Sequence, residues 1–100
     1  MKEITTFTLQ KMIEDSESLN VIDVRNIDEI ATGYIAESIH IPLPLVEFKL
    51  PDIEKSKKYY VICRSGGRSA IAVQFLEDRG YNVTNVQGGM DAWTGPMQYS

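Results

Sequence analysis

The distribution of hydrophobic and polar positions predicts a chain in which strands and helices alternate. Residues 21–24 and 59–62 are dense in β-branched and aromatic side chains with little polar alternation, a pattern typical of strands covered on both faces. Residues 38–41 are stopped by a proline and residues 82–86 by two glycines, so both segments predict shorter strands. Residues 3–5 predict a fifth strand with weaker support.

Three helices are predicted between these strands, at residues 8–15, 28–32 and 69–78. In the last of them Ala72, Phe75 and Leu76 share one face, as in a helix packed on a sheet. Gly80 follows as a natural helix stop. The segment 45–58 predicts a short helix at most and then a solvated, lysine-rich loop.

Strands that alternate with helices in a chain of 100 residues predict a single α/β domain over residues 1–100, with a mainly parallel sheet. Such sheets place their sites in the loops at the carboxyl ends of the strands. The search for a site therefore narrows to the residues that follow Val24, Ile41, Ile62 and Val86.

The composition argues against several classes of protein. Hydrophobic residues make up 43% and charged residues 24% of the chain, proportions of a globular protein rather than a disordered one. The net charge of −4 repels phosphate backbones and anionic lipid, so neither nucleic acid nor a membrane is expected as a partner. The first residues lack the apolar stretch of a signal peptide, and no apolar run approaches the length that spans a bilayer.

Cys63 is the one cysteine of the chain. A single thiol excludes an intramolecular disulfide and any zinc site built on a cysteine pair. It also points to a reducing compartment, so we expect a cytoplasmic protein without a bound metal.

The segment 63–69, Cys-Arg-Ser-Gly-Gly-Arg-Ser, joins an apolar predicted strand to the strongest predicted helix. Backbone N–H groups at the start of a helix carry partial positive charge and stabilise an anion in front of them. Gly66 and Gly67 can adopt positive φ, so the loop can curl with its amides turned inward as an anion-binding nest. Ser65 and Ser69 add hydroxyl donors, and Ser69 also suits a helix cap.

Arg64 and Arg68 add charge to this loop. The segment holds no acidic residue, so it carries a charge of +2 while the rest of the chain carries −6. We expect the inward-facing backbone amides, the start of the following helix and the two arginines to lower the pKa of the Cys63 thiol together. A lowered pKa favours a reactive thiolate. A cysteine at the end of a buried strand is often only a small hydrophobic side chain, but that interpretation does not explain the glycines and arginines that follow it.

The loop at residues 63–69 resembles the active-site loop of the rhodanese family of sulfurtransferases. Other segments are similar to motifs of that family in the same order: Val-Ile-Asp-Val-Arg at 21–25, Gly-Tyr-Ile at 33–35, Ser-Ile-His-Ile-Pro at 38–42 and Gly-Gly-Met-Asp-Ala-Trp at 88–93. Together they cover nearly the whole chain. The resemblance implies a five-stranded, mainly parallel sheet flanked by helices on both faces.

The resemblance also implies transfer of sulfane sulfur. Cys63 would attack an anionic donor such as thiosulfate, hold the outer sulfur as a persulfide, and pass it to a thiol or cyanide, with a sulfur-carrier protein as a further candidate partner. The loop residues that would surround the substrate are Arg64, Ser65, Gly66, Gly67, Arg68 and Ser69. A thiolate needs neither a general base nor a cofactor for this chemistry.

The chain departs from the family pattern on the side opposite the loop. Tyr34 stands where the family often has histidine, and residues 37–38 stand where it often has a Gly-Ala pair. The tail after Trp93 predicts a short last helix. We expect the glycines at 88–89 to form a turn with positive φ, and Met90 and Trp93 to belong to the core or a pocket wall.

Asp23 and Arg25 end the strand at residues 21–24, close to the predicted site. We expect both to support the structure rather than to act on substrate. In this interpretation Arg25 pairs with Asp28 or Glu29 as a clamp.

Three other functions are compatible with a reactive cysteine. A phosphatase of the same fold typically places five residues between its cysteine and arginine, whereas four separate Cys63 from Arg68, which favours the smaller sulfur atom. A non-enzymatic persulfide carrier or redox sensor would use the same thiol, with reduction supplied from outside. A Cys-His hydrolase would need His40 beside Cys63, and we expect His40 to be structural.

Overall fold

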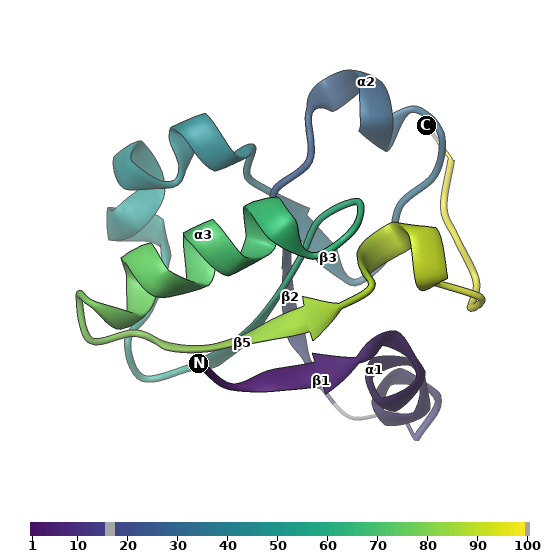
Figure 1. The fold of residues 1–100 in the computed structure, drawn as a ribbon, viewed down its shortest axis with the longest axis horizontal. Helices are drawn as coiled ribbons and strands as arrows, with labels where there is room; N and C mark the ends of the chain where they lie inside the picture. The colour runs from purple at the N-terminus through teal and green to yellow at the C-terminus, as the bar shows by residue number, and fades with distance from the viewer. Residues whose placement is uncertain (16–17, 100) are drawn as a thin grey trace.

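The predicted strands form one five-stranded sheet in the computed structural model of the protein, which describes residues 1–15 and 18–99 (Figure 1). The strands are β1 (Glu3–Thr5), β2 (Asn20–Asp23), β3 (Ser38–His40), β4 (Lys58–Ile62) and β5 (Asn82–Gln87). They lie in the order β1-β5-β4-β2-β3, and every pairing between them is parallel. The α/β fold is confirmed, with strand ends shifted from the prediction by one residue at most.

The unbroken apolar runs of the central strands are explained by burial on both faces of the sheet. Successive strand residues point to opposite faces. Ile22 of β2 accordingly belongs to the cluster that contains Val73 of the third helix, whereas its neighbour Val21 belongs to the cluster that contains Leu9 of the first. All four side chains are at most 1% exposed, so each face of the sheet carries its own core.

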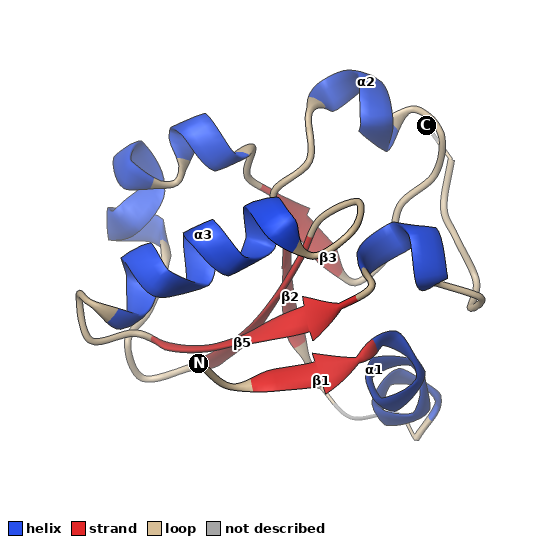
Figure 2. Ribbon diagram, viewed as in Figure 1, coloured by secondary structure: helices blue, strands red, loops and turns tan. Residues whose placement is uncertain are grey.

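Helices cover both faces, with α3 (Gly67–Glu77) on one side and α1 (Thr6–Glu14) on the other (Figure 2). The other helical segments are α2 (Ile27–Ile30) and the 3-10 turns η1 (Leu43–Leu45), η2 (Glu47–Asp52) and η3 (Gly89–Ala92). None of the helices within the described residues is long and apolar enough to cross a membrane.

Two helix starts and one helix end differ from the prediction by two residues, and the other helix bounds differ by one. Helix α1 begins two residues early because the Thr5 hydroxyl accepts a hydrogen bond from the Thr8 N–H and caps it. Helix α3 also begins two residues early, because Gly66 takes a left-handed conformation that leads the loop directly into Gly67. The helix predicted at 28–32 is the single turn α2, which ends two residues earlier than predicted.

The C-terminal tail returns across the site end of the sheet. The backbone N–H of Tyr34 donates to the Gln98 carbonyl over 2.9 Å, and the Gln98 N–H donates back over 2.7 Å, which forms an antiparallel bridge. The Trp93 ring N–H donates to the Pro96 carbonyl and fixes the turn before that bridge. As Figure 1 shows, the yellow tail thereby ends close to α2, so residues of the tail can line a site beside the helix.

Candidate active site

Cys63 follows the last residue of β4, the central strand of the sheet, and opens the loop to α3. Its side chain is fully buried. The sulfur accepts a hydrogen bond from the Gly66 N–H over 3.0 Å and lies 3.3 Å from the Ser69 hydroxyl oxygen. The carboxyl end of a parallel strand and the start of a helix therefore meet at this thiol, as expected for a site in such a sheet.

The surroundings of Cys63 change its acidity in two opposite directions. Burial raises the pKa of the thiol because a thiolate is poorly solvated inside the protein. The contact with the Ser69 hydroxyl and hydrogen bonds from the backbone N–H groups of Ser69, Gly66 and Ser65 lower it, and together they outweigh burial. The net pKa of Cys63 is below that of an ordinary thiol, which favours the nucleophilic thiolate.

The two loop glycines have different roles, whereas the sequence suggested the same role for both. Gly66 has a φ of +106° and is the N-cap of α3, which turns its N–H toward the Cys63 sulfur. Gly67 is the first residue of α3 and does not adopt positive φ. The amide nest therefore depends on one left-handed glycine.

The two loop serines, Ser65 and Ser69, contact the thiol in different ways. Ser69 does not cap α3, contrary to the prediction; it lies inside the helix with its side chain fully buried, and Gly66 is the N-cap. Its hydroxyl instead contacts the Cys63 sulfur and lies 2.5 Å from Oδ1 of Asn85. The Ser65 side chain is exposed, and Ser65 acts on the thiol through its backbone N–H.

Asn85 is a site residue that the sequence analysis missed. It lies on β5, is 2% exposed, and takes a hydrogen bond from Ser69 while its own amide group donates to Glu3 over 2.9 Å. A chain of polar contacts thus runs from Cys63 through Ser69 and Asn85 to the first strand. The available signal was an amide side chain in the middle of a strand predicted within the sheet, because a buried amide calls for a partner.

Both loop arginines contact carboxylates, which corrects the expected excess of positive charge. The Arg68 guanidinium binds both carboxylate oxygens of Glu29, over 2.6 and 2.7 Å. The Arg64 Nε lies 3.4 Å from Oδ1 of Asp91, and both of those side chains are mostly exposed. The charge of +2 carried by the loop is therefore offset by residues from α2 and η3.

Glu29 is held in place by two elements. Besides Arg68, its carboxylate accepts a hydrogen bond from the Asn26 N–H over 2.9 Å, which forms part of the capping box of α2. The contact with Arg68 is the main reason why the pKa of Glu29 falls from 4.5 to about 2. The carboxylate is thus ionised across the neutral range and ties α2 to the cysteine loop.

Arg25 pairs with Asp23 rather than with the carboxylates of Asp28 or Glu29, which corrects the predicted clamp. Its guanidinium donates to both oxygens of Asp23 over 2.9 to 3.1 Å and to the Gly33 carbonyl over 2.8 Å. Asp23 has no exposed surface and Arg25 is 4% exposed, so the pair is buried. The guanidinium also reaches the backbone carbonyl of Glu29, so it joins β2 to α2.

His40 lies at the end of β3 and hydrogen-bonds, through Nε2, to the Arg25 backbone carbonyl over 2.7 Å. No hydrogen bond joins His40 to Cys63 among the described residues. The geometry gives no support to a Cys-His pair.

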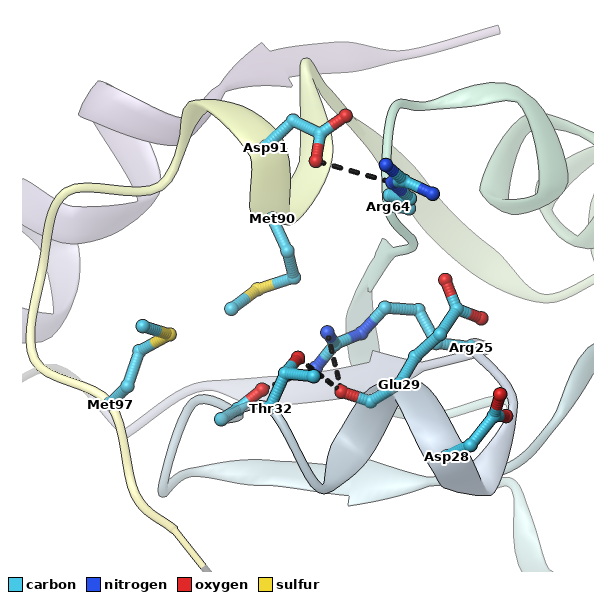
Figure 3. Close-up of a pocket in the computed structure, with 9 residues that line it drawn as sticks. Arg25, Asp28, Glu29, Thr32, Arg64, Met90, Asp91 and Met97 are labelled. Atoms are coloured by element: carbon cyan, nitrogen blue, oxygen red, sulfur yellow. Dashed lines mark hydrogen bonds and ion pairs between the residues drawn. The ribbon is translucent and has the colours of Figure 1, made fainter.

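A pocket of about 470 Å³ lies beside the loop (Figure 3). Its lining residues are Arg25, Asp28, Glu29, Thr32, Gly33, Arg64, Met90, Asp91 and Met97. Met90 from η3 and Met97 from the tail form the wall that faces α2, which confirms the pocket-wall expectation for Met90. Trp93 is buried in the core cluster with Leu9, as expected. Cys63 does not line this pocket itself, but its neighbour in the chain, Arg64, does.

The glycine turn at 88–89 is confirmed, and it also docks the loop. Both glycines have positive φ. The N–H groups of Met90 and Asp91 donate to the carbonyls of Cys63 and Arg64, each over 2.8 Å. A side chain at Gly89 would collide with those carbonyl groups, so only glycine allows η3 to approach the cysteine loop so closely.

Comparison with known proteins assigns a family to this arrangement. The model of the family described as "Rhodanese-like domain" matches residues 5–96. The chain is 42% identical over 95 residues to "Putative sulfurtransferase YtwF" of Bacillus subtilis (strain 168), covering 95% of this chain and 92% of that protein. It is 37% identical over 97 residues to "Putative sulfur carrier protein YrkF" of the same organism, covering 96% of this chain and 52% of that protein. The crystal structure of a rhodanese-like domain protein from Staphylococcus aureus superposes with a TM-score of 0.95 at 37% identity, covering 100% of this chain and 99% of that one.

Proposed function

The chain belongs to the family of rhodanese-like domains, and on that basis we propose that it transfers sulfane sulfur through a persulfide on Cys63. Relatives named as sulfurtransferases support sulfur transfer in general. The observation that carries the proposal is the position of the Cys63 sulfur at the start of α3, where it accepts a hydrogen bond from the Gly66 N–H. The pKa of the thiol is lowered there.

The proposed reaction has two displacement steps. The Cys63 thiolate attacks the outer sulfur of an anionic donor such as thiosulfate; the new S–S bond forms as the donor's S–S bond breaks, and sulfite leaves with the bonding electron pair. A thiolate or cyanide then attacks the outer sulfur of the persulfide and restores the Cys63 thiolate. Electrons and atoms balance without a cofactor or an external oxidant.

The loop is suited to hold the persulfide. A persulfide is an anion one atom longer than a thiolate, and its inner sulfur keeps the position of the Cys63 sulfur. The backbone N–H groups of Ser65, Gly66 and Ser69 converge on that position and stabilise negative charge there without the desolvation cost of a buried cation.

Access to the sulfur requires a movement of the loop. The Cys63 side chain has no exposed surface, while Arg64 and Ser65 beside it are exposed. We therefore propose that the Arg64 side chain and residues 65–66 shift away from the sulfur when a donor approaches from the adjoining pocket. The Arg64 side chain is exposed and only weakly held by Asp91, while the Arg64 carbonyl stays bound to the Asp91 N–H.

A persulfide carrier is the second candidate function. It is favoured by the 37% identity to the protein named a sulfur carrier, although this chain covers only about half of that relative. A carrier would accept sulfur at Cys63 and release it to a docked protein rather than turn over small donors. Since one thiol serves both functions, we propose a sulfur-carrier protein as a candidate partner and, from the reactive lone thiol, a cytoplasmic location.

A phosphatase is disfavoured by the loop. Four residues separate Cys63 from Arg68, and the Arg68 guanidinium is bound to Glu29, where it cannot also enclose a phosphoryl group. Turnover of a phosphate ester at a rate comparable to that of thiosulfate would reverse this ranking.

Intact-mass spectrometry tests the proposal. Incubation with thiosulfate is expected to add one sulfur atom to the wild-type chain, and cyanide or a reducing thiol should remove it. Cys63→Ser should stay unmodified and unfold at nearly the wild-type temperature. An unchanged wild-type mass after treatment with both thiosulfate and an organic sulfane donor, while the thiol still reacts with iodoacetamide, would contradict the proposed function.

A further inference from the structure

Each arginine around the candidate site is already bound by a carboxylate. Arg25 holds Asp23, Arg68 holds Glu29 and Arg64 contacts Asp91. Asp28 adds a further carboxylate to the pocket lining. Among the residues that the structure describes around the loop, three guanidinium groups thus face four carboxylates.

We propose that Glu29 sets the charge class of the sulfur donor: by occupying Arg68 it makes the site prefer donors with a single negative charge, such as organic persulfides or thiosulfonates, over dianions such as thiosulfate. This inference rests on the proposed function and narrows its substrate. Thiosulfate remains a donor in this scheme, but a poor one.

The geometry of the Glu29–Arg68 pair carries the argument. Two oxygens meet two guanidinium nitrogens over 2.6 and 2.7 Å, so both terminal nitrogens of Arg68, the donors that a sulfonate would need for a paired contact, are engaged by Glu29. The Asn26 N–H fixes the same carboxylate to α2, which opposes its rotation away from Arg68. Arg68 and Glu29 retain 30% and 21% exposure, so solvent screens the pair only in part.

Arg64 does not replace the occupied Arg68. Its side chain is 68% exposed, and only Nε reaches Asp91, at 3.4 Å. A charge on so exposed a side chain is strongly screened and attracts a donor only weakly. Binding of a dianion at the loop would therefore rely on backbone N–H groups, which carry partial rather than full positive charges.

Two donors that transfer the same atom test the proposal. The thiolate takes the outer sulfur from thiosulfate with sulfite as the leaving group, and from methanethiosulfonate, CH3SO2S⁻, with methanesulfinate as the leaving group. The readout is the ratio of kcat/KM for thiosulfate to kcat/KM for methanethiosulfonate, with cyanide as the acceptor. Glu29→Gln keeps the shape of the side chain and its contact with the Asn26 N–H, and it removes the negative charge that neutralises Arg68.

Glu29→Gln is expected to raise this ratio about tenfold, because Arg68 becomes available for a charge-assisted contact to the second charge of thiosulfate. Glu37→Gln is the matched control: it makes the same change in net charge at an exposed residue outside the pocket lining and should leave the ratio within about twofold of wild type. Combining Glu29→Gln with Arg68→Gln should abolish the gain. Thermal unfolding and circular dichroism establish that each variant is folded.

The outcomes separate this inference from the proposed function. If both donors load Cys63 but Glu29→Gln leaves the ratio unchanged, or if the double variant keeps the gain, the role assigned to Glu29 is wrong while sulfur transfer stands. If neither donor loads Cys63 in any variant, the proposed function fails and this inference falls with it.

Discussion

The Ser69 hydroxyl donates to Oδ1 of Asn85 over 2.5 Å, and the same hydroxyl oxygen lies 3.3 Å from the Cys63 sulfur. The side-chain amide of Asn85 is oriented by Glu3, whose carboxylate can only accept and so binds Nδ2. The amide oxygen must then face Ser69. Since a hydroxyl has one hydrogen, a Cys63 thiolate and the Asn85 oxygen compete for it, whereas a protonated thiol can donate to Ser69 without conflict.

Replacing Ser69 with alanine is expected to raise the pKa of Cys63. The contact with this hydroxyl makes the largest contribution to lowering the pKa. Without it, the rise in pKa caused by burial would be offset less. The pH dependence of iodoacetamide alkylation, followed by intact mass, should shift to higher pH. Ser65→Ala is the matched control, because Ser65 reaches the sulfur through its backbone N–H, and its profile should coincide with that of wild type.

Replacing Asn85 with alanine is expected to have the opposite effect. Without the competing amide oxygen the Ser69 hydrogen can turn to the thiolate, so the pKa of Cys63 should fall and alkylation at neutral pH should become faster. The effect should vanish in the Ser69→Ala background. An Asn85→Ala profile that moves to higher pH, or one that moves equally in both backgrounds, would show that Asn85 acts on the thiol by another route.

The Glu29–Arg68 pair is expected to make stability depend on pH in the acid range. The pKa of Glu29 lies at about 2 in the folded protein, below its ordinary value of 4.5, so the ionised carboxylate favours the folded state. This contribution is complete above pH 4.5 and is lost as the pH falls toward 2. With allowance for solvent screening of a partly exposed pair, we expect about 1 kcal/mol. Urea unfolding should show wild type more stable than Glu29→Gln at pH 7, with a difference that shrinks below pH 4.5; a constant difference would contradict the linkage.

Gly89→Ala is expected to destabilise the protein by about 2 kcal/mol or more, since it combines a strained backbone with a collision. Gly89 has a φ of +56°, and a side chain there would overlap the carbonyl groups of Cys63 and Arg64. Gly67→Ala is the control, because its added methyl meets nothing within 4 Å and the residue has no positive φ. Urea unfolding of Gly67→Ala should show a stability equal to or slightly above that of wild type.

The strands could be predicted from sequence because their information is local. The run from Val21 to Val24 needs both faces covered, whichever residues cover them, so its pattern alone indicates a central strand. The first residues of the helices were harder to predict from the sequence. Helix propensity disfavours Gly67 as a helical residue, and its place in α3 follows from the left-handed turn at Gly66, which depends on the packing of the loop against η3.

The chemistry around Cys63 was predictable mainly from residues that are neighbours in the sequence. Residues 63–69 adjoin one another in sequence, so their combined chemistry could be recognised directly. The partner of Arg68 is 39 residues away on α2, and spacing favoured a local pair of Arg25 with Asp28 or Glu29 instead. The sheet order that brings Asn85 to Ser69 is likewise a tertiary property, which no local pattern encodes.

The buried pair of Asp23 and Arg25 allows a last prediction that separates structural support from catalysis. Removing one partner leaves an uncompensated buried charge, so Asp23→Ala should cost about 3 kcal/mol in the free energy of unfolding. Asp91→Ala breaks the exposed contact with Arg64 and should cost less than about 0.5 kcal/mol. Under conditions where Asp23→Ala remains folded, its pH profile of Cys63 alkylation should match wild type, because neither member of the pair contacts the sulfur. A shifted profile in a folded Asp23→Ala protein would mean that this pair tunes the thiol as well as supporting the sheet.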